Sequence, residues 1–503
     1  MKPFFFYSLG LRESTTTSAR PIGFAVGGAK DVNNFRENIH NNYLPIITDL
    51  SYEGIFYDYF FDTSNEQQQH DEQKQLFCPS YSMAFTTNQE YFMTVELNSN
   101  LTEETFQRNP MNLVVCIDRS GSMGSSFSSY HYDKQQKDNN DTRSKMAITL
   151  DVVSKVIDHL KSNDRLGIIA FDSDASIVQT ITQFDSIQLD KLKKELSRIS
   201  ASGGTDMSAA INCCASLFDT EIITNDHQQQ YDNRILFLTD AQPNQGNLSE
   251  NHFYNRIEQL AKHRIYFTFI GVGIDLNTAL ISSITKHRGA NYFSVHNSKK
   301  FNDLLDKDFD LIVTPLVFNV ELKFQSDLFD VENVYGSPNT DKNQLIRINT
   351  LFPSRTDDNS RTRGGVVLIK LKPKQVIQEK KLHTNACLSV TYEDRCGKSF
   401  EEKQLIYILV QNEIYYGNLG IRKAILLVNY INLLKQWIQY ERETNQANLS
   451  EWERQSTKLA VSKQYRQQFQ LFLTHLQTEI DVLNDQDLQQ EVKLLNKLIA
   501  YDD

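Results

Sequence analysis

The sequence lacks any apolar stretch of the roughly 18 to 20 residues that a membrane-spanning helix requires. We therefore expect no transmembrane segment. The apolar run at residues 2–7 is short, contains a single positive charge, and is not followed by a clear small-residue cleavage site. We expect a strand or a packed arm there, and not a signal peptide.

Positive charge is also scarce. The 503 residues include 52 Lys and Arg against 63 Asp and Glu, which gives a formal net charge of −11. Nucleic acid is bound by a basic face, and an anionic membrane attracts basic segments, so we expect neither as a partner. A chain of this length with 40% hydrophobic residues has material for about two to four separate cores.

The six cysteines lack the spacing of a metal site. None forms a CxxC pair, and no histidine cluster completes a zinc pattern. Cys116, Cys213 and Cys214 fall in apolar patterns that are typical of buried free thiols. Cys387 and Cys396 flank a predicted turn and could pair in a secreted protein. We interpret the cysteines as reduced thiols, which favours a cytoplasmic protein.

Apolar runs and helical stripes alternate between residues 111 and 315. Residues 113–117 and 166–171 are continuously apolar, as in strands buried on both faces, and residues 146–160 have one helical stripe between them. Residues 177–181 predict a short antiparallel edge strand. This order predicts a doubly wound, mostly parallel α/β sheet with a Rossmann-like arrangement.

Shorter strands and then helices flank this α/β region, so the chain is predicted to be multidomain. Two apolar stripes near its end predict a C-terminal helical hairpin. Strands on both sides of the α/β domain predict that it is inserted in a β-sandwich. The predicted parts are an N-terminal arm or linker (1–76), the β-sandwich (77–110 and 316–411), the α/β domain (111–315) and the helical region (412–503).

Oxygen-bearing side chains stand at the carboxyl ends of two predicted strands and at the start of one predicted helix. They are Asp118, Ser120, Ser122, Thr205 and Asp240. Open α/β sheets bind ligands at the carboxyl ends of their strands. Carboxylates and hydroxyls are hard donors, which suit Mg²⁺, Mn²⁺ or Ca²⁺ better than zinc.

In order and spacing these five residues resemble the metal-ion-dependent adhesion site of von Willebrand factor type A domains, which integrin I domains share. The strand and helix pattern over residues 111–315 resembles the same fold. The resemblance implies that Ser120 and Ser122 contact the ion directly. It implies that the two aspartates bind the ion directly or through water, and that Thr205 contacts it in one conformational state.

The charge of this set predicts a binding function. Two aspartates balance one divalent ion, and a hard cation that prefers about six oxygen ligands keeps open positions, one of which a partner's Asp or Glu can fill. We therefore predict a cation-dependent adhesion or recognition module for a protein ligand, with Mg²⁺, or alternatively Mn²⁺ or Ca²⁺, as the ion. The alternative is an intracellular scaffold subunit that makes its contacts through the helical tail.

Catalytic machinery is not evident. Phosphohydrolases of the haloacid dehalogenase type have a second aspartate two residues after the first, where this chain has Ser120. The glycine-rich residues 23–28 lack the lysine of a P-loop, and no Ser-His-Asp order is found. We predict that the chain is not an enzyme, with a metal-dependent hydrolase as the most distant alternative.

A long polar insertion, residues 125–143, follows the first aspartate loop. It includes Tyr130, His131 and Tyr132, and it must emerge beside the predicted ion. Two interpretations stay open at this point. The insertion either selects the partner, as loops at a binding site do, or it is a disordered excursion.

Overall fold

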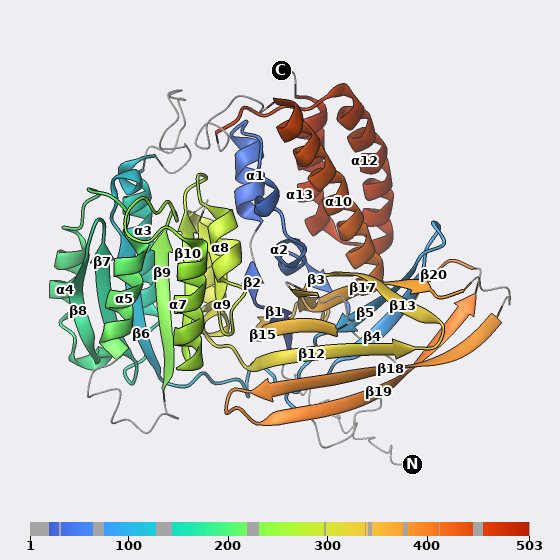
Figure 1. The fold of residues 1–503 in the computed structure, drawn as a ribbon, viewed down its shortest axis with the longest axis horizontal. Coiled ribbons are helices and arrows are strands. Elements are labelled where there is room, and N and C mark those ends of the chain that lie inside the picture. The colour runs from blue at the N-terminus through green and yellow to red at the C-terminus, as the bar shows by residue number, and fades with distance from the viewer. Residues whose placement is uncertain are drawn as a thin grey trace, which may run out of the picture.

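The computed structural model shows an α/β unit, a pair of antiparallel sheets and a group of helices (Figure 1). No helix among the described residues is both long and apolar enough to cross a membrane. The six cysteines are free thiols. The structure describes residues 20–29, 32–63, 75–126, 143–218, 231–295, 298–337, 339–340, 345–375, 381–411, 413–445 and 456–501.

One seven-stranded sheet forms the centre of the α/β unit. Its strands are β2 (Gly28–Ala29), β6 (Met111–Asp118), β7 (Arg165–Phe171), β8 (Ala175–Gln183), β9 (Asp232–Thr239), β10 (Ile265–Val272) and β11 (Asn291–Val295). They lie in the order β2-β11-β10-β9-β6-β7-β8, and all neighbours are parallel except β7 and β8. The predicted doubly wound sheet and its antiparallel edge strand are therefore confirmed. The strand order reverses beside β6, which is where such sheets bind ligands.

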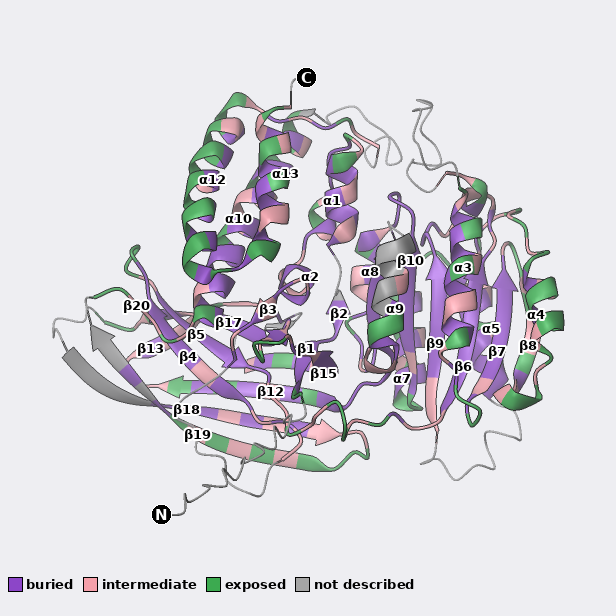
Figure 2. Ribbon diagram, turned by 180° about the vertical axis from the view of Figure 1, so that it is seen from behind, coloured by how far each residue is buried: buried purple, intermediate pink, exposed green. Residues whose placement is uncertain are grey.

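Helices cover both faces of this sheet, so that strands β6, β7, β9, β10 and β11 are largely buried, whereas most residues of the edge strand β8 are partly or fully exposed (Figure 2). Side chains of β6 alternate between the two cores, with Val115 and Ile117 in one and Val114 and Cys116 in the other. This two-sided burial explains the continuous apolar run. The first core is completed by α3 (Lys145–Asp158), α4 (Leu189–Leu196) and α9 (Ser298–Val313), and the second by α5 (Met207–Phe218), α7 (Glu250–Lys262) and α8 (Thr278–Ile284).

Two antiparallel sheets, which share a core, lie together beside the α/β unit (Figure 1). The six-stranded sheet consists of β1 (Ile22–Val26), β15 (Leu345–Arg355), β12 (Val317–Ser326), β18 (Lys381–Asp394) and β19 (Ser399–Gln411) in that order, with β14 (Asn339–Thr340) paired to β15. The five-stranded sheet consists of β13 (Phe329–Tyr335), β17 (Val366–Pro373), β5 (Tyr91–Glu96), β4 (Ser80–Phe85) and β20 (Tyr415–Tyr416). A short pair joins β3 (Phe60–Phe61) to β16 (Thr362–Arg363).

The five-stranded sheet is covered on both faces. Met83 and Met93 belong to the core that it shares with the six-stranded sheet. Their neighbours Ala84 and Phe92 belong to a second core, which the helices complete. These helices are α1 (Asn33–His40), α2 (Tyr52–Tyr57), α10 (Leu419–Asn445), α12 (Lys463–Leu483) and α13 (Gln489–Ile499).

Part of the segment that we predicted as an arm or linker, residues 1–76, is integrated into the fold, over residues 20–29 and 32–63. Strand β1 pairs with β15, and β2 pairs with β11. Arg36 of α1 contacts Glu491 of α13 at 2.5 Å, and the hydroxyl of Tyr59 donates to the same carboxylate at 2.7 Å. These partners are hundreds of residues away in the sequence, so no local pattern predicts them. Residues 64–74 lie outside the described part.

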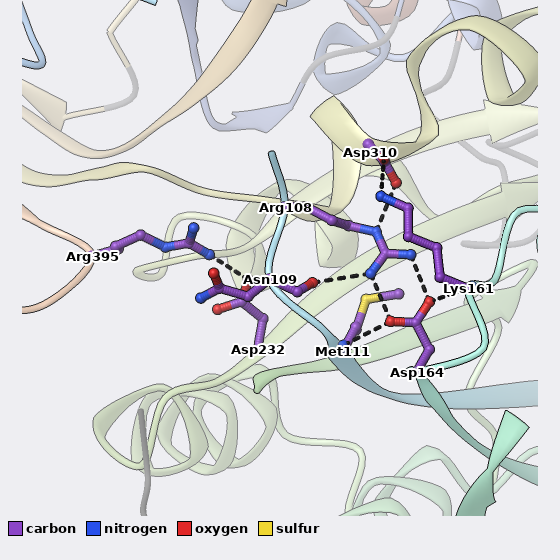
Figure 3. A network of polar contacts seen from close by, with 8 residues as sticks. All are labelled: Arg108, Asn109, Met111, Lys161, Asp164, Asp232, Asp310 and Arg395. Carbon is purple, nitrogen blue, oxygen red and sulfur yellow. Dashed lines mark hydrogen bonds and ion pairs between the residues drawn. The ribbon is translucent and has the colours of Figure 1, made fainter. Parts of the chain in front are cut away.

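An ion-pair network around the buried side chains of Arg108 and Asp164 lies where the chain enters and leaves the α/β unit (Figure 3). Arg108, just before β6, donates to both oxygens of Asp164 at 2.7 and 2.6 Å and to Asp310 of α9 at 2.7 Å. Asp164 also accepts from the backbone N–H groups of Met111 and Lys161. The network therefore fixes the first and last elements of the unit together, at the amino end of β6.

Candidate functional site

Three loops meet at the carboxyl edge of the α/β sheet, where β6 and β9 run side by side. Asp118 is the last residue of β6 and is fully buried. Its Oδ1 accepts from the backbone N–H of Ser120 at 2.8 Å, which turns the chain sharply after the strand. The hydroxyls of Ser120 and Ser122 lie 3.1 Å apart, so both serines present oxygen to the same small region.

Backbone hydrogen bonds tie the Thr205 loop to this first loop. The N–H of Gly121 donates to the carbonyl of Gly203 at 3.1 Å, and the N–H of Ser202 donates to that of Arg119 at 2.7 Å. Gly203 has a φ of +76°, in the left-handed region that favours glycine. Thr205 itself is buried, with 1% of its surface exposed. The glycine thus lets the loop adopt this turn without strain, and the two backbone hydrogen bonds hold it against the first loop.

Asp240 follows β9 and completes the set. The hydroxyl of the preceding Thr239 donates to Oδ2 of Asp118 at 2.6 Å, which links the ends of the two strands. The N–H of Asn244, in the same loop, donates to the carbonyl of Thr205 at 3.1 Å. The structure therefore brings the loops of Asp118, Thr205 and Asp240 together at one edge.

Sequence reasoning missed two charged residues beside this set. Lys145, the first residue of α3, donates to Oδ2 of Asp240 at 3.0 Å and to Oδ1 of Asp275 at 2.5 Å. Burial lowers the pKa of Lys145, but Asp275 and Asp240 outweigh burial and raise the pKa above its usual value. Asp275 follows β10, so the strand-end argument could have identified it, whereas nothing in the apolar stripe around Lys145 could.

The residues at this edge fit a divalent cation. Oδ1 of Asp240 is buried and has no hydrogen-bond partner among the described residues, as expected of an oxygen that an ion would bind. The three carboxylates of Asp118, Asp240 and Asp275 and the ammonium of Lys145 have a net charge of −2 when ionised. One divalent ion balances this charge. In the described ranges no three His, Cys, Asp or Glu residues are grouped to hold a metal, so serine and threonine hydroxyls would have to supply the remaining ligands.

Asp118 should make cation binding depend on pH. Burial and the nearby Asp240 carboxylate raise the pKa of Asp118 to about 7 from its usual 3.8. A cation needs the ionised form, so we expect Mg²⁺ affinity, measured by calorimetry, to fall roughly tenfold for each pH unit below about 7. An affinity that stays constant between pH 5.5 and 8 would contradict this expectation.

The same shift predicts the opposite trend for stability without metal. Because the folded pKa lies above the unfolded value, the folded state binds the proton more tightly. The contribution of Asp118 to stability is therefore most favourable below about pH 4 and is lost as pH rises through about 7. As pH falls from about 7 to about 4, Mg²⁺ affinity should therefore fall while the contribution of Asp118 to stability rises. A loss of Mg²⁺ binding that came only from acid unfolding would instead be accompanied by a loss of stability.

The structure leaves one part of the predicted site untested. Tyr130, His131 and Tyr132 lie outside the described residues, as does the rest of segment 127–142. The ends of the insertion are described: Ser126 and Ser144 form an isolated β-bridge, and the N–H of Lys145 donates to the carbonyl of Ser125 at 3.0 Å. The insertion therefore leaves and rejoins the fold directly beside Lys145.

Comparison with known proteins identifies the α/β unit. Residues 113–242 match the family model for the von Willebrand factor type A domain, and the chain contains such a domain. Human inter-alpha-trypsin inhibitor heavy chain H4 is 21% identical over 219 residues, which cover 43% of this chain and 22% of that protein. The match thus spans about a fifth of the length of this relative.

Two of the solved structures that resemble this chain have lower sequence identity to it than heavy chain H4 has. A von Willebrand factor type A protein from Catenulispora acidiphila is 15% identical, with 69% of this chain and 77% of that chain covered and a TM-score of 0.41. Proximal thread matrix protein 1 from the mussel byssus, described with a zinc-occupied MIDAS motif, is 14% identical, with 42% and 49% covered and a TM-score of 0.32.

Proposed function

We propose that the von Willebrand factor type A domain, matched over residues 113–242, is a divalent-cation-dependent module that binds a protein partner. The observation that supports this most is the meeting of three loops at one edge of the sheet, with two buried carboxylates among their side chains. Such domains are typically protein-interaction modules. The ion would join the buried site to the partner.

In this proposal Mg²⁺ is the ion, with Mn²⁺ or Ca²⁺ as substitutes. The candidate ligands are Asp118, Ser120, Ser122, Thr205 and Asp240. The two aspartates supply charge and the three hydroxyls supply neutral oxygen, which suits a hard cation. Since such an ion prefers about six oxygen ligands, at least one position stays available for the Asp or Glu of a partner.

We also propose that the two antiparallel sheets form a β-sandwich in which the α/β domain is inserted. Their shared core and the Arg108–Asp310 ion pair at the ends of the inserted unit support this arrangement. Helices α10 and α12 would form a hairpin on the other side of the five-stranded sheet. Contacts between Trp437 and Phe469 and between Tyr430 and Phe472 support their pairing.

Binding is proposed here in preference to catalysis. Ser120 occupies the position at which an acid–base aspartate would be needed, and Lys145 is held by two carboxylates. The scaffold function is the second candidate, because the helices form a large core against the five-stranded sheet. In that case the partner would contact the helices and not the ion.

Paired peptides provide the test of this function. The full chain is immobilised and exposed in Mg²⁺ to peptides that contain one central Asp or Glu, and to the same peptides with Asn or Gln. We expect binding of acidic peptides that EDTA reverses, and that Asn or Gln weakens at least tenfold, because a charge-assisted contact to the ion is lost. The same matrix is used to capture proteins in Mg²⁺, with elution by EDTA.

The outcomes separate the candidates. Capture that survives EDTA and requires residues beyond 418 would favour the scaffold function. Metal-dependent turnover of a generic phosphoester that Asp118→Ala abolishes would instead favour a hydrolase.

A further inference from the structure

Lys145 is a buried cation in direct contact with a candidate cation ligand. Its side chain has 0% exposure, and so has that of Asp240. The ammonium lies 3.0 Å from Oδ2 of Asp240 and 2.5 Å from Oδ1 of Asp275. Burying an ammonium is costly unless carboxylates pair with it, and here two do.

The surrounding backbone is shaped to hold this lysine. Gly273 has a φ of +94°, and a Cβ atom at that position would stand 2.6 Å from Cε of Lys145. A side chain at position 273 would therefore displace the lysine as well as strain the backbone. The side-chain amide of Gln242 donates to the backbone carbonyl of Asp275 at 2.5 Å, which fixes the loop that presents the second carboxylate.

This contact makes the two oxygens of Asp240 unequal. Oδ2 accepts from the ammonium, whereas Oδ1 is buried without a hydrogen-bond partner in the described part of the chain. A divalent ion is repelled by Lys145 and attracted by the unpartnered oxygen. Asp240 can therefore offer the ion one oxygen, and bidentate binding would require it to give up the lysine.

We infer that Lys145 is a positioning residue that restricts Asp240 to one oxygen and so makes the site prefer Mg²⁺ or Mn²⁺ over Ca²⁺. This inference rests on the proposed metal function. Mg²⁺ requires a compact, near-octahedral set of single oxygens, whereas Ca²⁺ takes six to eight ligands and readily binds both oxygens of a carboxylate. Loss of the lysine would release the second oxygen and favour the larger ion.

The test removes the Lys145–Asp275 ion pair without changing the net charge of the chain. In Lys145→Met/Asp275→Asn, one positive and one negative group are lost together, and Asp118 and Asp240 stay intact. Lys423→Met/Asp485→Asn is the matched control, because it removes an equally buried pair, 3% exposed on each side, from the helices. The dissociation constants for Mg²⁺ and Ca²⁺ alone are measured by calorimetry on the full chain.

We expect the native chain and the control to prefer Mg²⁺, and the preference to fall at least tenfold in the Lys145 variant. An unchanged ratio of the two constants in a folded Lys145 variant overturns the inference and leaves the metal function intact. A native chain that binds neither ion contradicts the proposed function itself.

A second variant keeps the inference testable if Lys145→Met/Asp275→Asn does not fold. Lys145→Gln/Asp275→Asn keeps an N–H donor for Oδ2 of Asp240, so it preserves a buried hydrogen bond while it removes the charge. We expect a smaller fall in the preference for Mg²⁺, of a few fold, because a neutral amide is displaced more easily than an ammonium. No fall in this variant also counts against the inference.

Discussion

Replacing Asp118 with alanine is expected to weaken Mg²⁺ binding at least 100-fold. The carboxylate supplies half of the negative charge among the candidate ligands, and it is fully buried, where charge is poorly screened. It also organises the site, because Ser120 and Thr239 both donate to it. Its loss therefore removes a ligand and releases the loop that presents the serines.

Calorimetry with Mg²⁺ and the thermal midpoint with and without Mg²⁺ measure this effect. The native chain should melt at a higher temperature when the ion is present, since binding to the folded state stabilises it, and the variant should show no rise. Asp190→Ala, an exposed acid in α4 of the same domain, is the control and should behave as the native chain does. Equal Mg²⁺ affinity in Asp118→Ala would exclude this aspartate as a ligand.

Replacing Asp164 with alanine is expected to lower the free energy of unfolding by about 3–5 kcal/mol. Asp164 is fully buried and accepts from both terminal nitrogens of Arg108, whose side chain is 1% exposed. The N–H groups of Met111 and Lys161 also donate to it. Without the carboxylate, Asp310 and the backbone carbonyl of Asn109 are the acceptors that Arg108 keeps among the described residues.

Urea unfolding followed by circular dichroism measures this loss. Glu258→Ala is the control, because it removes an exposed i,i+4 ion pair with Lys262, and such pairs contribute about 1 kcal/mol or less. Because the chain has several cores, the comparison uses the first transition in each case. A loss below about 1 kcal/mol in Asp164→Ala would mean that Arg108 finds another acceptor or reaches water.

The α/β unit was predictable because its signals are local. The apolar run at residues 113–117 corresponds to β6, and the predicted edge strand at 177–181 corresponds to β8. Helix α8 begins at Thr278, so Asp275 and Leu276 belong to the loop after β10 and not to the helix.

The remaining parts depend on long-range partners. Strand β1 is five residues long, and its partner β15 lies more than 300 residues later, so its pairing has no signature in the local pattern. Lys145 shows the same limit within the site. A lysine at the start of an amphipathic helix ordinarily faces water, and only the fold reveals that two carboxylates bury it.

A crystal structure of the full chain grown in Mn²⁺, with the ion located by its anomalous scattering, tests the proposed cation site most directly. We expect one peak at the carboxyl edge of the sheet, within about 2.0–2.3 Å of the hydroxyl oxygens of Ser120 and Ser122. The peak should lie on the Oδ1 side of Asp240, away from Lys145. No peak there, or a peak only elsewhere on the chain, would contradict cation binding by these residues.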